Sequence, residues 1–262
     1  MRDSEQKHTE VMTATAVLSC DDWQLEVQVT VPNGPTRLRQ LLPLAQSFAD
    51  AIVRSAMQTT EAQGDKISCK QGCGACCRQL VPMSETEARH IADVVQSLPE
   101  PRRTLVRERF DNARKRLEEV GLLDPLRHPG QNNQGTAQSL GIQYFRQGIA
   151  CPFLENESCS IYADRPIACR EYLVTSPPEH CAQPTTDPVR GVQLPLKTWT
   201  ALARFDKVLP PAQTIRWIPL ILAPEWAAEN PHEPEPRPGP ELVRELFDYL
   251  TTKKTASANV DD

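Results

Sequence analysis

The sequence predicts a mainly α-helical fold in which the helices surround a loop-rich core of cysteines, with a small β-hairpin at the N-terminus. Several segments repeat apolar residues at helical spacing, whereas two runs near the N-terminus alternate apolar and polar residues as strands do. All but one of the 9 cysteines fall in two loop-like clusters, and two of the predicted helices separate these clusters.

The N-terminal segments favour a hairpin followed by a long helix. Residues 13–19 and 24–31 lean towards β-structure, and the Asp-Asp pair between them can turn the chain. Residues 33–35 (Asn-Gly-Pro) are typical of a helix start, because proline is tolerated in the first turn. The apolar face that follows runs to a predicted end near Gly64. It consists of Leu38, Leu41, Leu42, Ala45, Phe48, Ile52, Val53 and Ala56.

Two further helices are predicted between the cysteine clusters. Ser84 and Glu87 form a capping-box pattern before an apolar face at helical spacing. A charged helix then runs from Pro101 to about Val120, and Gly121 is a suitable stop. Its buried stripe is Val106, Phe110, Ala113, Leu117 and Val120, and its Arg and Glu residues form a solvated face. We expect residues 124–140, which are polar and rich in Gly, Asn and Gln, to be a loop.

The C-terminal third is predicted to combine proline-rich connectors with helices. Many of the 24 prolines lie between residues 177 and 240, and such stretches favour extended connectors because proline lacks the backbone donor of a helix or central strand. Helical patterns occur at 197–207, in the second half of 217–229, and at 240–251. We expect disorder after Lys254.

Composition bounds the class of protein. The chain has 262 residues with a net charge of −5, 39% hydrophobic and 24% charged residues, as expected for a globular protein with a real core. The negative charge argues against a general nucleic-acid binder. No apolar run approaches the length of a membrane helix, and the start, MRDSEQKHTE, has no signal-peptide core. We therefore expect a cytoplasmic protein that binds neither nucleic acid nor membrane, with reduced thiols.

The first cysteine cluster is the string CKQGCGACC, which holds Cys69, Cys73, Cys76 and Cys77. Thiolates packed this closely repel one another unless a cation or an oxidised partner neutralises them, and thiolate is the soft ligand that holds zinc and iron–sulfur centres. Gly74 and Ala75 suit the Cys-x2-Cys turn, because small residues let the backbone approach an ion. Adjacent Cys76 and Cys77 usually point different ways, so they could serve two centres, or one could support the other.

The second cluster is the string CPFLENESCSIYADRPIACREY, which holds Cys151, Cys159 and Cys169; Cys181 follows, with His180 beside it. Eight cysteines could form one four-sulfur site with spares or two four-ligand sites. A disulfide framework is disfavoured because the cysteine count is odd and the chain is long. Cys20, on a strand-like segment, is better explained as a buried apolar residue, and His180 as a solvated loop residue.

Two arginines flank Cys169. Arg165 and Arg170 could offset the net negative charge of a four-thiolate centre. Alternatively they are structural and pair with Asp164 or Glu171. The sequence leaves both readings open.

The two cysteine strings, together with SETEARHI between them, resemble the YkgJ-like, or CxxCxxCC, cysteine-cluster family of zinc- or iron-chelating domains. The resemblance covers residues 69–181, and we expect it to extend to the C-terminal helix. It implies a bacterial cytoplasmic metalloprotein whose metal-binding set is Cys69, Cys73, Cys76, Cys77, Cys151, Cys159 and Cys169. Cys181 is added as a further candidate ligand. A flagellin lysine methylase carries a related cysteine motif, but this chain lacks a clear methyl-donor motif, so that activity is not carried over.

Two classes of function follow. The first is a metal-binding protein with a redox, sensing or metal-handling role and an unidentified protein partner. The second is a metalloenzyme, for example a protein-modifying one, with an open coordination position. Histidines are few and mostly far from the cysteines, so an all-sulfur centre fits better. A single Cys-x2-Cys spacing favours an iron–sulfur cluster over zinc, because structural zinc commonly uses two such pairs.

The predicted organisation has the two helices between the clusters folding back as a helical hairpin that brings the clusters together. The expected parts of the chain are an N-terminal hairpin segment (1–34), a cysteine-cluster metal-binding domain (35–182), a proline-rich wrap with C-terminal helices (183–253) and a disordered tail (254–262).

Overall fold

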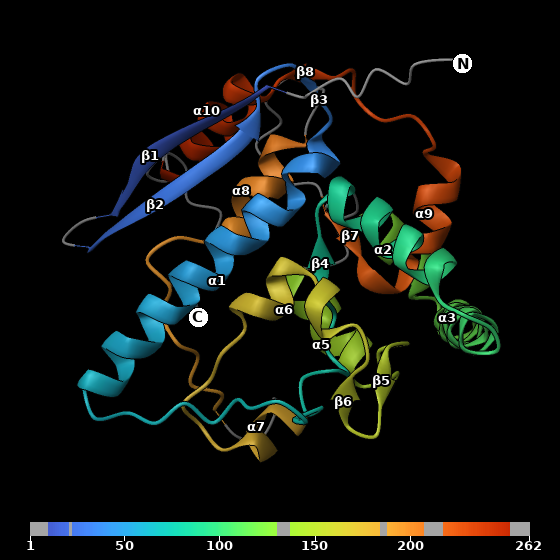
Figure 1. Ribbon diagram of the computed structural model, residues 1–262. Helices are drawn as coiled ribbons and strands as arrows, with labels where there is room; N and C mark the ends of the chain where they lie inside the picture. Colours follow the sequence, from blue (N-terminus) through green and yellow to red (C-terminus); the bar gives the residue numbers. More distant parts are fainter. Residues whose placement is uncertain (1–9, 21–22, 130–136, 184–187, 207–216, 252–262) are drawn as a thin grey trace, which may run out of the picture.

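The fold is mainly helical with an N-terminal β-hairpin, as predicted, in a computed structural model that describes residues 10–20, 23–129, 137–183, 188–206 and 217–251 (Figure 1). The helices are α1 (Leu38–Ala62), α2 (Glu85–Ser97), α3 (Arg102–Glu119), α4 (Leu123–Arg127), α5 (Ala137–Phe145), α6 (Ile167–Glu171), α7 (Pro178–Ala182), α8 (Thr198–Phe205), α9 (Ala223–Glu229) and α10 (Gly239–Thr251), with 3-10 turns η1 (Tyr162–Asp164) and η2 (Leu220–Leu222). The strands are β1 (Val11–Cys20), β2 (Trp23–Pro32), β3 (Pro35–Thr36), β4 (Pro82–Met83), β5 (Leu154–Glu155), β6 (Ser158–Cys159), β7 (Ile218–Pro219) and β8 (Arg237–Pro238).

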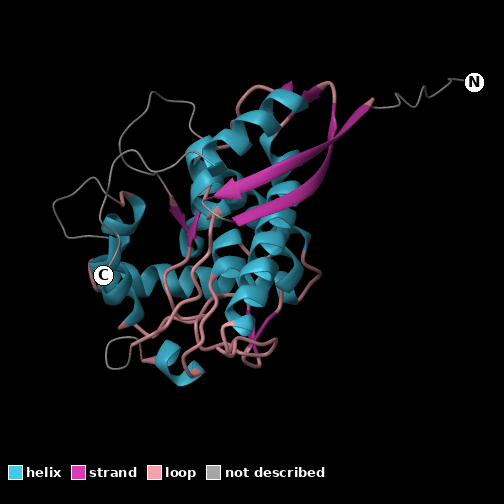
Figure 2. Cartoon of the chain, turned by 90° about the vertical axis from the view of Figure 1, so that its left-hand side faces the viewer, coloured by secondary structure: helices cyan, strands magenta, loops and turns pink. Residues whose placement is uncertain are grey.

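The hairpin of β1 and β2 is antiparallel, with a register from Val11 opposite Pro32 to Cys20 opposite Trp23. Its apolar face packs on α1 and α10, and Figure 2 shows the two strands lying across the helices. The predicted Asp-Asp turn lies outside the described residues. The predicted hairpin is thus confirmed. The alternation of apolar and polar residues in β2 indicated it, because every second side chain of this strand faces the core.

The predicted helix start at residues 33–35 is wrong. Pro35 and Thr36 form strand β3, which pairs with β8, and α1 begins only at Leu38. Proline at this position supports an extended segment as readily as a first helical turn. The helix does end where expected, and Gly64 follows it with a φ of +90°.

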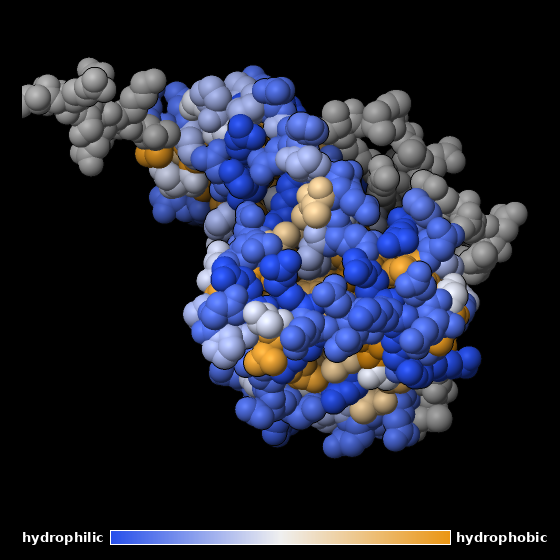
Figure 3. All heavy atoms as spheres, turned by 90° about the vertical axis from the view of Figure 1, so that its right-hand side faces the viewer, coloured by the Kyte–Doolittle hydropathy of each residue, from blue (hydrophilic) through white to orange (hydrophobic). Residues whose placement is uncertain are grey.

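The two helices between the cysteine clusters are confirmed. Ser84 and Glu87 form the capping box of α2, and Gly121 ends the turn after α3 with a φ of +71°. The stripe of α3 is buried except at Val120, which is 43% exposed at the end of the helix. Figure 3 shows the face on the side of α3 and α9 as mostly hydrophilic, as expected for the charged surface of α3.

The loop expected at residues 124–140 is in part helical. Helix α4 occupies its start and α5 begins at Ala137, while residues 130–136 lie outside the described part. Leu126 and Leu140 are buried in the core, so single apolar residues inside a polar segment anchor these short helices. Pro125 is tolerated because it stands in the first turn of α4.

The C-terminal helical patterns are confirmed as α8, α9 and α10, whereas Lys207 and the tail after residue 251 lie outside the described residues. Within the described residues, no helix is long and apolar enough to cross a bilayer.

The buried apolar side chains form two clusters, and the second cysteine segment contacts both. One cluster is built from α2 to α5 with the 218–223 segment, and the partly buried Cys151 and Cys159 pack against it. The other is built from the hairpin, α1, α8 and α10, and it includes Ile167 of α6. The segment carrying the second set of cysteines therefore joins the two cores.

Candidate metal centre

The two cysteine segments lie side by side. The backbone N–H of Cys151 donates to the carbonyl of Cys77 at 2.7 Å. Helices α2 and α3 contact each other, and Phe110 of α3 packs edge-on against Phe153 with ring centroids 5.6 Å apart. The two clusters meet, as the sequence predicts, but the connection also includes the short helices α4 and α5, which the sequence did not predict.

Gly74 lets the first loop sit against the β5–β6 hairpin. A Cβ at this position would stand 2.6 Å from Oε2 of Glu157 and 2.8 Å from Cδ1 of Leu154, so no larger residue fits without movement. The turn residues Asn156 and Glu157 have left-handed φ values of 50° and 55°. Arg78 then joins the two loops, donating to Glu157 at 2.8 Å and to the carbonyl of Gly74 at 3.1 Å. The close approach of the two cysteine loops is therefore built into their backbones.

Backbone amides point at several of the sulfurs. Val174 N–H donates to Sγ of Cys69 at 3.4 Å, and Ser68 N–H donates to the carbonyl of Val174 at 2.9 Å. The amide of Phe153 donates to the sulfur of Cys151, and the amide of Ile161 to that of Cys159. Each bond lowers the pKa of its thiol, because it favours the thiolate. Such N–H···S bonds accompany thiolates that ligate metals.

Burial and neighbouring thiols raise the pKa of six of the clustered cysteines. Burial is the largest cause of the raised pKa at Cys69, Cys151, Cys159, Cys169 and Cys181, and it takes the pKa of Cys151 to about 12. The pKa of Cys76 is raised chiefly because its thiol is hydrogen-bonded to Cys77, and then by burial. A soft metal ion or cluster would remove this repulsion, so the donor set fits a thiolate-ligated centre.

Cys76 is the common neighbour of the cluster. Its charge contributes to the raised pKa of five other thiols, namely Cys69, Cys151, Cys159, Cys169 and Cys181. Cys73 acts on Cys69 and Cys181, whereas Cys151 and Cys159 act on Cys169. Cys76 therefore lies near thiols of both cysteine segments. Among the described residues, no three His, Cys, Asp or Glu side chains converge as a site for a single metal ion.

The two arginines beside Cys169 have different surroundings. Arg170 is buried, pairs with Asp50 at 2.9 Å and also donates to the carbonyl of Ala163. One interpretation of the sequence expected Asp164 or Glu171 as its partner, but the carboxylate that it binds is Asp50. Arg165 stacks on the ring of Tyr162 at 4.0 Å, and its buried Nε has no hydrogen-bond partner. The charge of Arg165 lowers the pKa of three thiols, at Cys69, Cys76 and Cys159. Arg165 is thus the arginine that offsets the thiolates.

The short helix α6, which carries Cys169, is held by a carboxylate from α2. Glu87 is buried and accepts from the amides of Ile167 at 2.7 Å and Ser84 at 3.0 Å. Glu171 of α6 in turn accepts from the first amide of α8, at Thr198. Asp206, at the end of α8, accepts from both the amide and the hydroxyl of Thr86 at the start of α2. In each of the helices α2, α6 and α8, an amide at the N-terminus is therefore bound by a carboxylate of another of these three helices or its end.

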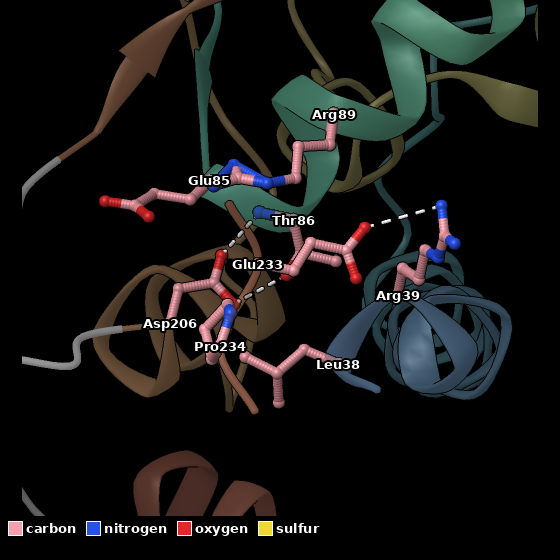
Figure 4. Close-up of a pocket in the computed structure, with 8 residues that line it drawn as sticks. All are labelled: Leu38, Arg39, Glu85, Thr86, Arg89, Asp206, Glu233 and Pro234. Atoms are coloured by element: carbon pink, nitrogen blue, oxygen red, sulfur yellow. Dashed lines mark hydrogen bonds and ion pairs between the residues drawn. The ribbon is translucent and has the colours of Figure 1, made fainter. Parts of the chain in front are cut away.

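Figure 4 shows the link between Asp206 and Thr86, next to a small cavity of about 10 Å³ between α2 and the 233–234 segment. This volume holds about one water molecule. Burial raises the pKa of Asp206 to about 7 and that of Glu171 to about 8.

The remaining candidate residues have clear positions. Cys181 is 3% exposed on α7, and Tyr172 hydrogen-bonds its side chain. Gln79, just after the first cluster, donates to the hydroxyl of Tyr172 at 3.2 Å. His180 lies on α7 rather than in a loop, and its Nδ1 stands 3.0 Å from the carbonyl of Pro188. Cys20 is half-buried and packs against the core of the hairpin, so it lies in the part of the fold where an apolar role was expected.

Residues 68–186 match the model of the CxxCxxCC family, described as a "putative zinc- or iron-chelating domain". The cysteine-rich part of the chain is therefore similar to the CxxCxxCC family. The matched segment contains the eight clustered cysteines and ends before the C-terminal helices, to which the resemblance was expected to extend. No curated protein and no solved structure matches the chain.

Several residues that shape the cysteine-rich part of the chain were not found from the sequence. Glu87 was noted only as part of a capping box, and its bond to Ile167 joins segments 80 positions apart. The pair of Arg78 and Glu157 and the hydroxyl of Tyr172 gave no sequence signal at all. The sequence did show that Gly74 suits a tight turn. It did not show that Gly74 also leaves room for Glu157 and Leu154.

Proposed function

We propose that the cysteine-rich part of this protein holds an iron–sulfur cluster through its clustered cysteines and that the cluster has a redox role. The domain family supports zinc or iron. The observation that carries the choice of iron–sulfur is the spacing of the cysteines. The clusters contain a single Cys-x2-Cys pair, at Cys73 and Cys76, whereas structural zinc commonly uses two such pairs.

A cluster fits this arrangement better than one zinc ion. Structural zinc needs four ligands at about 2.0–2.3 Å from a single point. An iron–sulfur cluster contains several irons and bridging sulfides, so its ligands surround a larger volume. The amides that donate to the sulfurs of Cys69, Cys151 and Cys159 are the kind of protein contact that sets a cluster's reduction potential.

The eight clustered cysteines are the proposed ligands, in two sets. One set would consist of Cys69, Cys73, Cys76 and Cys181, and the other of Cys151, Cys159 and Cys169 with Cys76 or its neighbour Cys77. When bound, the cluster supplies one-electron chemistry. The chain's own residues orient the thiolates, shield them from water and balance their charge through Arg165.

The test compares two cysteine variants purified without oxygen. Cys76→Ser removes the common neighbour of both sets, so we expect it to lose most of the bound iron and the visible absorption band. Cys20→Ser changes a thiol packed on the hairpin core and should keep the iron content of the unmodified chain. Full metal retention by Cys76→Ser would contradict the proposed centre, and one zinc per chain without colour would replace the iron–sulfur proposal by a zinc site.

A further inference from the structure

The outer edge of the N-terminal hairpin is open. β1 pairs with β2 on one side, and within the described residues no strand pairs with its other side. Figure 1 shows β2 lying between β1 and α1, with β1 outermost. Val11 is 57% and Val17 56% exposed on this strand. The edge is therefore accessible along most of β1.

The register tells which backbone groups of β1 are unpaired. Cys20 and Trp23 flank a two-residue connection, and such a connection is closed by a hydrogen-bonded pair. At the other end, Asn33 N–H donates to the carbonyl of Glu10 at 2.8 Å. Hydrogen-bonded and non-bonded pairs alternate in an antiparallel ladder, so the even-numbered residues of β1 bond to β2. The odd-numbered residues direct their N–H and C=O groups outwards; they are Val11, Thr13, Thr15, Val17 and Ser19.

This edge lacks the features that normally prevent pairing. Native edge strands are usually short, or carry charges or proline. The ten residues of β1, VMTATAVLSC, contain neither. By contrast β2 carries Glu26 on its exposed side and ends at Pro32. A long, uncharged edge with free backbone groups is a template for another strand.

We propose that the β1 edge pairs with the β1 edge of a second copy of this chain, forming a four-stranded antiparallel sheet across a two-fold axis. Pairing centred on Thr15 uses all five outward residues: Thr15 faces Thr15, Thr13 faces Val17, and Val11 faces Ser19. The strand is therefore complementary to itself, as a two-fold interface requires. No like charges meet, because the nearest charge on that face, Glu26, lies one strand further in.

The position of α10 favours a second copy over an isolated peptide. This helix contacts both strands of the hairpin and lies against their apolar face. In the joined sheet the centres of the two hairpins would be two strand spacings, or about 10 Å, apart. Packed helices have axes 8–10 Å apart, so the two copies of α10 could pack side by side beneath the sheet. Tyr249 on α10, 37% exposed, would be available for that contact.

The test combines sedimentation with hydrogen exchange on the full chain purified with its metal. We expect a monomer–dimer equilibrium that shifts with protein concentration. As dimer forms, the amides of Thr13, Thr15 and Val17 should exchange more slowly. The amides of Ala14 and Ala16, already bonded to β2, should not change.

Thr15→Lys puts two like charges opposite each other at the centre of the interface, so the dimer dissociation constant should rise roughly tenfold or more. Gln28→Lys is the matched control, because Gln28 is exposed on β2 directly across from Thr15 but faces no residue of the second copy. A chain that stays monomeric at every concentration, or a dimer that Thr15→Lys leaves intact, would overturn the proposal. If hydrogen exchange at the β1 amides slows only when an extended peptide is added, the edge binds a different partner, and this result would overturn the proposal as well.

Discussion

At the scale of single residues, the metal centre depends on side chains that are not sulfur. Gly74 gives the space in which the first cysteine loop meets the β5–β6 turn. Arg165 supplies a positive charge that acts on thiols from three different positions of the chain. These two residues determine how close the thiols come and how readily they become thiolates.

Gly74→Ala should separate the two cysteine loops. The added methyl group would overlap Glu157 and Leu154, and overpacking of this kind costs about 1–3 kcal/mol. We expect lower metal content per chain and a lower midpoint of thermal unfolding, measured by elemental analysis and circular dichroism. Gly141→Ala is the control, since nothing lies within 4 Å of a Cβ at that helical position. Equal metal content in both variants would show that the loops do not need this contact.

Arg165→Gln should weaken metal retention. Without the guanidinium charge the pKa of the thiols at Cys69, Cys76 and Cys159 rises further, so fewer thiolates form at neutral pH. We expect faster metal loss to a chelator and slower alkylation of the metal-free thiols. Arg165→Lys keeps the charge and should recover much of both properties. Arg103→Gln serves as the control, because Arg103 pairs with Glu100 and donates to the carbonyl of Gln96, and it contacts no cysteine in these bonds. Identical behaviour of Arg165→Gln and this control would exclude the charge-balancing role.

At the scale of elements, α6 illustrates how a helix of five residues is kept in place. Its first amide is bound by Glu87 of α2, and its own Glu171 binds the start of α8. A helix this short has little stability of its own, because nucleation costs more than a few hydrogen bonds return. The position of Cys169 is therefore set by long-range contacts.

Glu87→Ala should destabilise the fold and displace α6. It leaves the buried amides of Ile167 and Ser84 without their acceptor, and an unsatisfied buried donor costs about 1–3 kcal/mol. Urea unfolding should show this loss, together with reduced metal content. Glu108→Ala changes an exposed residue of α3 and should be nearly neutral. A Glu87→Ala variant as stable as Glu108→Ala would mean that the carboxylate does not hold α6.

The long helices were predictable, whereas several short ones, α4 and α6 among them, were not, for a physical reason. Helices α1, α2, α3 and α10 have an apolar face repeated over several turns, so local sequence alone indicates them. Helices α4 and α6 have one or two anchoring side chains each, such as Leu126 and Ile167, and depend on partners far away in the sequence. Pro35 misled the prediction because proline suits a strand edge as well as a helix start.

At the scale of the whole molecule, the buried carboxyls of Glu87 and Asp206 link the two cores, and buried carboxyls make the stability depend on pH. Burial raises the pKa of Asp206 to about 7, whereas an unfolded aspartate has a pKa of about 4. Between these values the folded chain binds more protons than the unfolded chain. The free energy of unfolding therefore falls as the pH rises, by up to about 1.4 kcal/mol per pH unit for each such group.

Asp206→Asn should flatten this dependence. The amide of Asn still offers an oxygen to Thr86 N–H, but it does not titrate. We expect the free energy of urea unfolding to fall less steeply between roughly pH 4 and pH 7 in the variant than in the unmodified chain. Glu87 and Glu171 titrate in both proteins, so the difference reports on Asp206. Parallel curves would show that this carboxyl is not titrating in the window.

The candidate site was predictable as a set of cysteines but not as a geometry. The strings around Cys69 and Cys151 gave the residues, and the helices between them indicated that the strings would meet. The role of Cys76 as common neighbour could not be predicted, because it depends on how three loops pack. The sequence also could not show which way Arg165 and Arg170 point. The carboxylate that pairs with Arg170 is Asp50, which belongs to the distant helix α1.

The most direct measurement of whether the clustered thiols hold an iron–sulfur cluster is the amount of iron, acid-labile sulfide and zinc per chain in protein purified without oxygen. We expect iron and sulfide in equal, stoichiometric amounts, with a broad visible absorption band that bleaches on reduction. Stoichiometric zinc without sulfide would contradict the iron–sulfur claim, and a folded chain with neither metal would contradict the metal centre itself.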